Sequence, residues 1–75
     1  MDRAEFTIRM HERWCERNPD KVDEEILRTE EFLARMRVHY REGDAEARER
    51  IKKGMESFVI RLEVLKQWRE RNGKQ

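Results

Sequence analysis

The 75-residue chain has few of the residues that define several structural classes, with one proline, three glycines and one cysteine. So little glycine and proline excludes collagen-like and linker-like chains. Cys15 has no partner for an intramolecular disulfide, which excludes a disulfide-stapled secreted scaffold. No apolar run approaches the roughly 20 residues of a membrane span, and MDRAEFTIRM lacks the apolar centre of a signal peptide. These absences predict a cytoplasmic or recombinant intracellular protein that is not secreted.

Charge and periodic apolar residues dominate what remains. Charged residues make up 47% of the chain and hydrophobic residues 36%, yet the net charge is only +1. The apolar residues recur at helical spacing, which argues against disorder. We expect residues 1–75 to form one domain, since domains begin at about 50 residues. A chain this small buries only about 60% of its unfolded surface, so burial against a partner would matter.

Two short interruptions divide the chain into three segments. At Asn18-Pro19-Asp20 the proline disfavours helix at the residue before it, and either Asn18 or Asp20 can cap the next helix. At Glu42-Gly43-Asp44, we expect Gly43 to end the second helix in a left-handed conformation and Asp44 to cap the start of the third. We expect Asn72-Gly73 to end the third helix in the same left-handed way. Acidic residues gather at the starts and basic residues at the ends of the second and third segments. The pattern predicts helices over about 3–17, 20–42 and 45–71.

The fold class follows from two apolar seams. In the second segment the seam is Val22, Ile26, Thr29, Leu33, Met36 and Tyr40, and in the third it is Ala47, Ile51, Met55, Phe58, Leu62 and Leu65. Joined by a tight loop, they predict an antiparallel hairpin. The shorter first helix should cross one end of it, beside Ile60, Val64 and Trp68. We therefore predict an all-α, up-down-up three-helix bundle with unequal helix lengths.

A second apolar stripe lies roughly opposite the seam of the middle helix. Leu27, Ala34 and Val38 follow helical spacing, with Glu31, Arg35 and Arg41 at the edges. They are either scattered surface residues, which are common, or a contact face for a helix of a second copy or of another protein.

The first helix also carries more apolar surface than one groove needs. One stripe is Ala4, Ile8, His11 and Cys15, and the adjacent one is Phe6, Met10 and Trp14. We expect the aromatic stripe to face the core, because it buries more surface, and the other to lie at the margin. The alternative is a deeply sunk helix with both stripes in the core. A partly exposed Trp14 or Trp68 would serve as an interface anchor. The candidate protein-binding residues are thus Leu27, Glu31, Ala34, Val38, Ile8, His11 and Trp14.

The far end of the hairpin gives a further indication of self-association. The residues there have no cover from the short first helix: Met36, Tyr40, Ala47 and Ile51. Two such ends could pair as a local four-helix bundle, which would make the protein a homodimer. Gly54, in mid-helix, either allows a close helix approach or is simply tolerated at a cost of about 1 kcal/mol.

Catalytic and metal chemistry find little support. His11 and Cys15 share a helix face, but the sequence shows neither a group that would orient the histidine nor an oxyanion site beside them. Together with His39 they would give three zinc ligands without a recognised spacing. The carboxylates lie on solvated faces, and no glycine-rich phosphate loop exists. We therefore expect no enzyme activity, no metal and no cofactor.

Nucleic-acid and membrane partners are not expected either. Acidic residues are interleaved with the basic cluster of Arg48, Arg50, Lys52 and Lys53. The pI near 7.9 is well below the value above about 9 that is typical of nucleic-acid-binding domains. A membrane-surface helix would need a more uniformly basic polar face. The expected partner is another protein or a second copy of this chain.

The loops Asn18-Pro19-Asp20-Lys21 and Glu42-Gly43-Asp44-Ala45, with polar faces filled by Glu, Arg and Lys, give the chain a recognisable style. In this it resembles de novo designed helical-bundle mini-proteins. Cys15, Gly54, four methionines and the surplus apolar positions depart from that style. The resemblance implies a designed protein that presents a rigid helix face to a partner. The alternatives are a small natural bacterial or phage regulator acting as a homodimer, and an enzyme using His11 and Cys15.

Overall fold

Three helices account for nearly all of the described chain. The computed structural model describes residues 2–73. Helix α1 spans Arg3–Arg17, a 3-10 turn η1 spans Pro19–Lys21, α2 spans Val22–Glu42 and α3 spans Ala45–Asn72. The all-α prediction is confirmed, and each predicted boundary lies within a residue of the observed one, with η1 forming the first turn of the predicted second helix.

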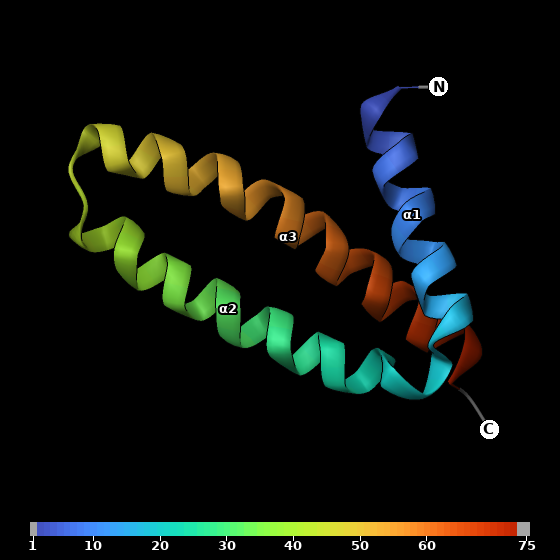
Figure 1. Cartoon of the computed structure of the whole chain (residues 1–75). Helices are drawn as coiled ribbons and strands as arrows, with labels where there is room; N and C mark the ends of the chain where they lie inside the picture. Colours follow the sequence, from blue (N-terminus) through green and yellow to red (C-terminus); the bar gives the residue numbers. More distant parts are fainter. Residues whose placement is uncertain (1, 74–75) are drawn as a thin grey trace.

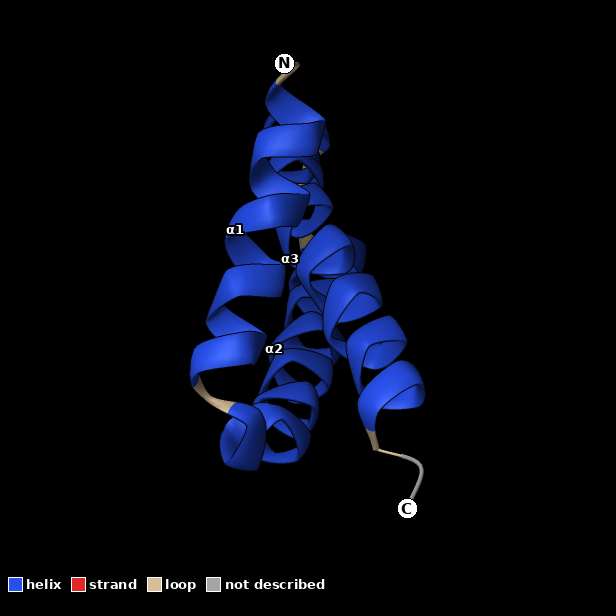
Figure 2. Cartoon of the chain, turned by 90° about the vertical axis from the view of Figure 1, so that its right-hand side faces the viewer, coloured by secondary structure: helices blue, strands red, loops and turns tan. Residues whose placement is uncertain are grey.

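The helices form an antiparallel hairpin with one helix across its end. Helices α2 and α3 lie side by side along their lengths, whereas α1 crosses α3 near its C-terminal end and leaves the rest of the hairpin uncovered (Figure 1). The view along the hairpin shows α1 leaning against α3 on one side (Figure 2). The Cα trace extends over 45 × 29 × 15 Å. Within residues 2–73, no helix is long and apolar enough to cross a membrane.

The ends of α1 are capped by its flanking residues. The Asp2 carboxylate accepts a hydrogen bond from the Glu5 backbone N–H at 2.9 Å, which satisfies one of the free donors of the first turn. At the other end, the Asn18 backbone and side-chain N–H groups both donate to the Trp14 carbonyl, each at 2.9 Å. Asn18 therefore ends α1. The prediction that Asn18 or Asp20 caps the second helix is wrong, since neither side chain makes that bond.

The hairpin loop is held by side chains from α3. The Asp44 carboxylate accepts from the Ala47 backbone N–H at 2.8 Å, which confirms the predicted cap. Gly43 is extended, with φ −83° and ψ 160°, so the predicted left-handed conformation is wrong. Instead, the Arg48 guanidinium donates to the Tyr40 carbonyl at 3.1 Å and the Arg41 carbonyl at 3.4 Å. It satisfies carbonyls that a left-handed glycine cap would otherwise serve. Gly73 is right-handed, with φ −92° and ψ −2°, so the left-handed conformation predicted for the end of the last helix is wrong as well.

The core is concentrated where all three helices meet. Cys15, Val22, Ile26 and Leu65 form one buried cluster, against which Trp14, Leu62 and Trp68 pack. Along the hairpin it continues through buried Thr29, Leu33 and Val64. The Thr29 hydroxyl donates to the Glu25 carbonyl at 2.8 Å, so its burial leaves no unmet donor. The predicted seam of α2 is therefore confirmed over its first half, from Val22 to Leu33, and the predicted seam of α3 is confirmed at its C-terminal end, at Leu62 and Leu65.

Toward the loop, burial declines as the sequence predicted. Met36, Ala47 and Ile51 are only half-buried and Tyr40 is exposed. Phe32 and Phe58 pack with tilted rings, centroids 4.4 Å apart, at about the middle of the hairpin. Beyond them only two helices remain to cover each other's apolar faces.

The expectation that the aromatic stripe of α1 faces the core is wrong for Phe6 and Met10 and is confirmed only for Trp14, which packs against the buried cluster. Phe6 is 56% exposed and Met10 51% exposed, whereas Cys15, on the other stripe, is completely buried. The alternative, in which both stripes of α1 lie in the core, is also wrong, because Ile8 is exposed as well. The helix meets α3 along a line between the two stripes that passes through His11 and Trp14.

Gly54 provides a test of the packing along the hairpin. A Cβ added at Gly54 would lie 3.7 Å from the Met36 methyl, an ordinary contact with a flexible side chain. Of the two explanations for Gly54, the structure therefore supports a tolerated glycine and not a close helix approach. Gly54→Ala should therefore raise the unfolding free energy by about 1 kcal/mol through helix propensity, measured by urea denaturation.

Gly43→Ala is the matched control for that substitution. Its Cβ would lie 3.1 Å from the Ala47 Cβ and 3.2 Å from the His39 carbonyl, so it should give no gain. A loss of stability in Gly54→Ala would contradict the packing described for this part of α3.

Candidate interaction surface

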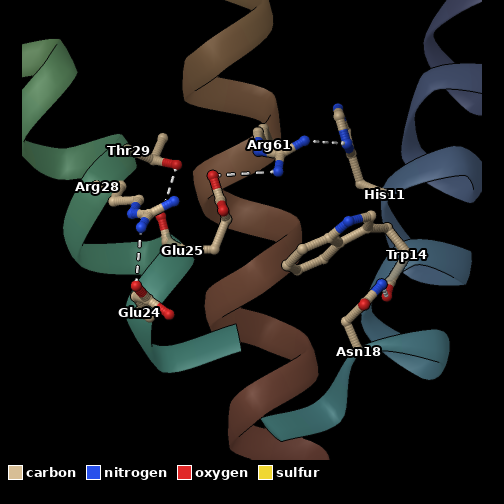
Figure 3. Close-up of polar contacts among 8 residues, drawn as sticks. All are labelled: His11, Trp14, Asn18, Glu24, Glu25, Arg28, Thr29 and Arg61. Atoms are coloured by element: carbon tan, nitrogen blue, oxygen red, sulfur yellow. Dashed lines mark hydrogen bonds and ion pairs between the residues drawn. The ribbon is translucent and has the colours of Figure 1, made fainter. Parts of the chain in front are cut away.

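Arg61 links the three helices on the side of the hairpin that α1 covers. Its guanidinium lies 3.3 Å from the Glu25 carboxylate of α2 and 3.4 Å from His11 Nδ1 of α1. It also lies over the Trp14 ring, 5.3 Å from the ring centroid. Figure 3 shows Arg61 reaching from α3 between Glu25 and His11, with Trp14 below. This junction therefore has a structural role, and no buried side-chain N or O atom of the described residues lacks a hydrogen-bond partner.

His11 takes part as a neutral acceptor. A guanidinium can only donate, so Nδ1 must be unprotonated and the proton must lie on Nε2. Burial, and secondly the Arg61 charge, lower the pKa of His11 below its ordinary value. His11 and Trp14, both candidates for partner binding, are thus already engaged in the contact between α1 and α3.

Cys15 lies inside the three-helix core with no exposed surface. Burial is the main cause that raises the pKa of its thiol, and a raised pKa opposes formation of the reactive thiolate. Among residues 2–73, no set of three His, Cys, Asp or Glu side chains is placed to hold a metal ion. His11 and Cys15 thus act here as packing residues.

The predicted stripe on α2 is exposed along its whole length. Leu27 is 62% exposed and Val38 44% exposed, and Glu31 and Ala34 between them are also exposed. We refer to these four residues, Leu27, Glu31, Ala34 and Val38, as the α2 stripe. Leu27 is the most exposed large apolar side chain of the described protein. The structure thus keeps these four candidate residues together on one helix face.

A mainly apolar groove of about 900 Å³ lies between α2 and α3 in the uncovered part of the hairpin. Its apolar lining comes from Tyr40, Met55, Val59 and Ile60, and its charged lining from Arg37, Arg41, Lys52 and Glu56. Arg37 and Arg41 follow Ala34 and Val38 by three residues, which is one helical turn. The groove and the α2 stripe are therefore neighbours.

Both features face away from α1. Arg61 points toward α1, where it contacts His11, and Glu25 points toward Arg61 on the same side of the hairpin. Leu27 and Val59 are each two residues from one of these, a rotation of about 200° around the helix. The α2 stripe and the groove consequently form one continuous surface on the free side of the hairpin, which we call the free face.

A smaller apolar patch lies on the outer side of α1. Phe6 and Met10, with Arg9 and Arg13, line a hollow of about 120 Å³. Ile8, the remaining candidate, is also exposed, but it lies two residues from both Phe6 and Met10, a rotation of about 200° around α1, and so faces away from this patch. The structure therefore does not bring the candidates on α1 and α2 together into one surface.

The sequence did not reveal the groove residues on α3. Helical spacing places Met55 in the seam and Ile60 on the side facing α1, and Val59 belongs to neither set. Val59 is the signal that could have found the groove, because it is an apolar residue that fits neither the seam nor the α1 contact. Arg37 and Lys52 looked like ordinary solvated charges.

Comparison with known proteins adds no relationship. No protein-family model, no curated protein and no solved structure matches the chain.

The lowered pKa of the half-buried His11 predicts a pH-dependent stability. In an unfolded chain histidine has a pKa of about 6.5, so as the pH falls the unfolded state takes up a proton before the folded state does. The free energy of unfolding should therefore fall between about pH 7.5 and pH 5.5, and His11→Gln should remove part of that fall. Urea denaturation across this range measures it. His39→Gln, at an exposed histidine of α2, is the control and should keep the wild-type profile.

The position of Cys15 predicts that the thiol is protected in the folded protein. Iodoacetamide should alkylate Cys15 at least about a hundredfold more slowly in buffer than in urea, because a buried, protonated thiol is a poor nucleophile. Mass spectrometry of timed samples measures the rate. Rapid alkylation of the folded protein would revive the enzyme hypothesis based on His11 and Cys15.

Proposed function

We propose that the protein is a non-catalytic interaction module that binds another protein chain through its free face. The observation that carries the proposal is the exposure of the α2 stripe beside the groove. A helix in a bundle normally turns one face inward and a polar face outward, whereas α2 is apolar on two sides. Contiguous apolar surface with a charged rim is typical of protein contact sites.

The amount of exposed surface supports this reading. The chain exposes 6138 Å², whereas a compact monomer of its 9.3 kDa exposes about 5,000 Å². The radius of gyration is 14.0 Å, against about 11 Å for a compact 75-residue domain. The excess of about 1,200 Å² is comparable to the roughly 800 Å² that each partner contributes to a standard interface.

The polar junction supports a role without catalysis. Its candidate catalytic groups, His11 and Cys15, are occupied in packing, and Arg61 is neutralised by Glu25. The resemblance to designed helical mini-proteins fits the same function, since binders of that type present a rigid helix face to their target. A natural homodimeric regulator is the second candidate, favoured by the uncovered end of the hairpin.

Polar substitution of the α2 stripe tests the proposal. Leu27→Gln with Val38→Gln should change the free energy of unfolding of the dilute, monomeric protein by less than about 0.5 kcal/mol, because both side chains are exposed and dilution removes any contribution from association. Helical peptides selected from a randomised library against the wild-type protein should bind this variant at least about tenfold more weakly. Circular dichroism and fluorescence anisotropy measure the two effects.

Phe6→Gln with Met10→Gln is the matched control, since it removes two exposed apolar side chains from α1 instead. This control should retain the wild-type peptide affinity. Peptides that bind wild type and the α2 variant equally would refute the proposed function. Unfolding of the α2 variant would show that the stripe belongs to the core.

A further inference from the structure

We propose that the partner of the free face is a second copy of this chain, packed so that the two α2 helices run antiparallel about a twofold axis. This inference rests on the proposed function and names its partner. It is drawn from the distribution of charge along the α2 stripe, from the spacing of that stripe and from the size of the excess surface.

One end of the α2 stripe is acidic. On a helix, the neighbours of Leu27 one turn away are the residues three and four positions before and after it. All four are acidic: Asp23, Glu24, Glu30 and Glu31. Three of them pair within the chain, with Arg69, Arg28 and Lys66 respectively. These pairs are exposed and therefore weak, so their carboxylates can engage a second partner.

The other end of the α2 stripe is basic. Val38 has Arg35 and Arg41 among its neighbours one turn away, and the adjacent groove adds Arg37 and Lys52. The acidic residues at this end are fewer: Glu42, one turn from Val38, and Glu56 in the groove. The stripe thus changes sign along its length, with Glu31 and Arg35 on either side of its midpoint.

Such a pattern is complementary to itself when one copy is reversed. A twofold axis through the middle of the stripe places Leu27 of one copy against Val38 of the other, and the same contact recurs on the other side of the axis. The acidic end of each helix then meets the basic end of its partner, and Glu31 of each copy lies beside Arg35 of the other. A parallel arrangement would instead place acidic ends together and basic ends together, which is unfavourable.

The spacing of the α2 stripe suits the same packing. Positions 27, 31, 34 and 38 follow the four-three-four rhythm of a coiled-coil seam, with apolar residues at three of the four positions and Glu31 at the other. Ala34, near the axis, is small enough to let the two helices approach closely. Two hairpins joined in this way form a four-helix arrangement in which α1 of each copy stays on the outside. The excess surface of about 1,200 Å² per chain covers what a stable dimer needs from each partner, roughly 800 Å².

The mass in solution is the first measurement. Light scattering after size exclusion, over about a hundredfold range of concentration, should give twice the 9.3 kDa chain mass at the upper end. The variant Leu27→Gln with Val38→Gln should be a monomer at every concentration, whereas Phe6→Gln with Met10→Gln should dimerise like wild type. A wild-type monomer throughout would overturn the inference.

A charge exchange at the centre of the stripe tests the antiparallel orientation. Glu31→Arg alone should weaken the dimer at least about tenfold, because the introduced arginine then faces Arg35 of the other copy twice per dimer. Arg35→Glu alone should weaken it similarly. The double variant should recover an affinity within about threefold of wild type, because both ion pairs re-form with reversed sign. A double variant as weak as the single ones would overturn the inference.

Engineered cysteines test the register directly. Leu27→Cys chains mixed with Val38→Cys chains should form a disulfide between the two, because these positions face each other in the antiparallel dimer. Leu27→Cys alone should not cross-link, since its two copies lie about 16 Å apart along α2, far beyond the roughly 7 Å that a disulfide allows between Cα atoms. Cross-linking of Leu27→Cys alone would show a parallel pair and overturn the inference. Native Cys15 is buried and serves as the common background.

The peptide selection described above separates this inference from the proposed function. A monomeric protein whose α2 stripe still binds selected helices would refute the second copy as partner and leave the interaction module standing. A monomer that also fails to bind them would refute both.

Discussion

The contact of Cys15 with Val22, Ile26 and Leu65 is the constraint on which the rest of the structure depends. It is the only place in the described chain where all three helices supply residues to one buried cluster. Because Asn18 ends α1 only three residues after Cys15, and α2 begins directly afterwards, this cluster forms beside the α1–α2 connection. It therefore determines both the position of α1 and the part of the hairpin that α1 covers.

The exposed apolar surfaces follow from that position. A helix of 15 residues anchored at its C-terminal end cannot reach along the 28 residues of α3, so the half of the hairpin near the loop has no third helix over it. The inter-helix ion pairs share this asymmetry: Glu25–Arg61, Glu30–Lys66, Asp23–Arg69 and Glu12–Arg71 all lie in the half near α1. Ion pairs and burial thus hold one half of the hairpin together, whereas the other half depends on partly buried apolar contacts and on the Arg48 hydrogen bonds beside the loop.

Local signals made most of the fold predictable. Asp44 caps a helix because its side chain can reach a backbone N–H three residues later, and the seam of Val22, Ile26 and Leu33 follows from helical periodicity alone. The α2 stripe was predictable for the same reason, because its residues share one helix and one face.

What could not be predicted depends on contacts between distant segments. The two stripes of α1 are almost equally apolar, and the choice between them is made by where α1 crosses α3. Phe6 and Met10 carry the larger side chains, yet they lie beyond the region that α3 can cover. The Arg48 cap of α2 was missed similarly, since an arginine that serves carbonyls seven and eight residues earlier has no local signature. The groove needs two helices to exist, so no single segment contains it.

The loop at Gly43-Asp44 and the three-helix core lie at opposite ends of the hairpin, which has a consequence for how the molecule fluctuates. Covalent connection limits how far α2 and α3 can separate at one end, and buried apolar contacts limit it at the other. Segments with few buried contacts open at low free-energy cost, so amide protection should be lowest near the loop and rise toward Leu65. The groove is therefore the part of the hairpin with the most freedom to change its width, while the core beside α1 remains closed.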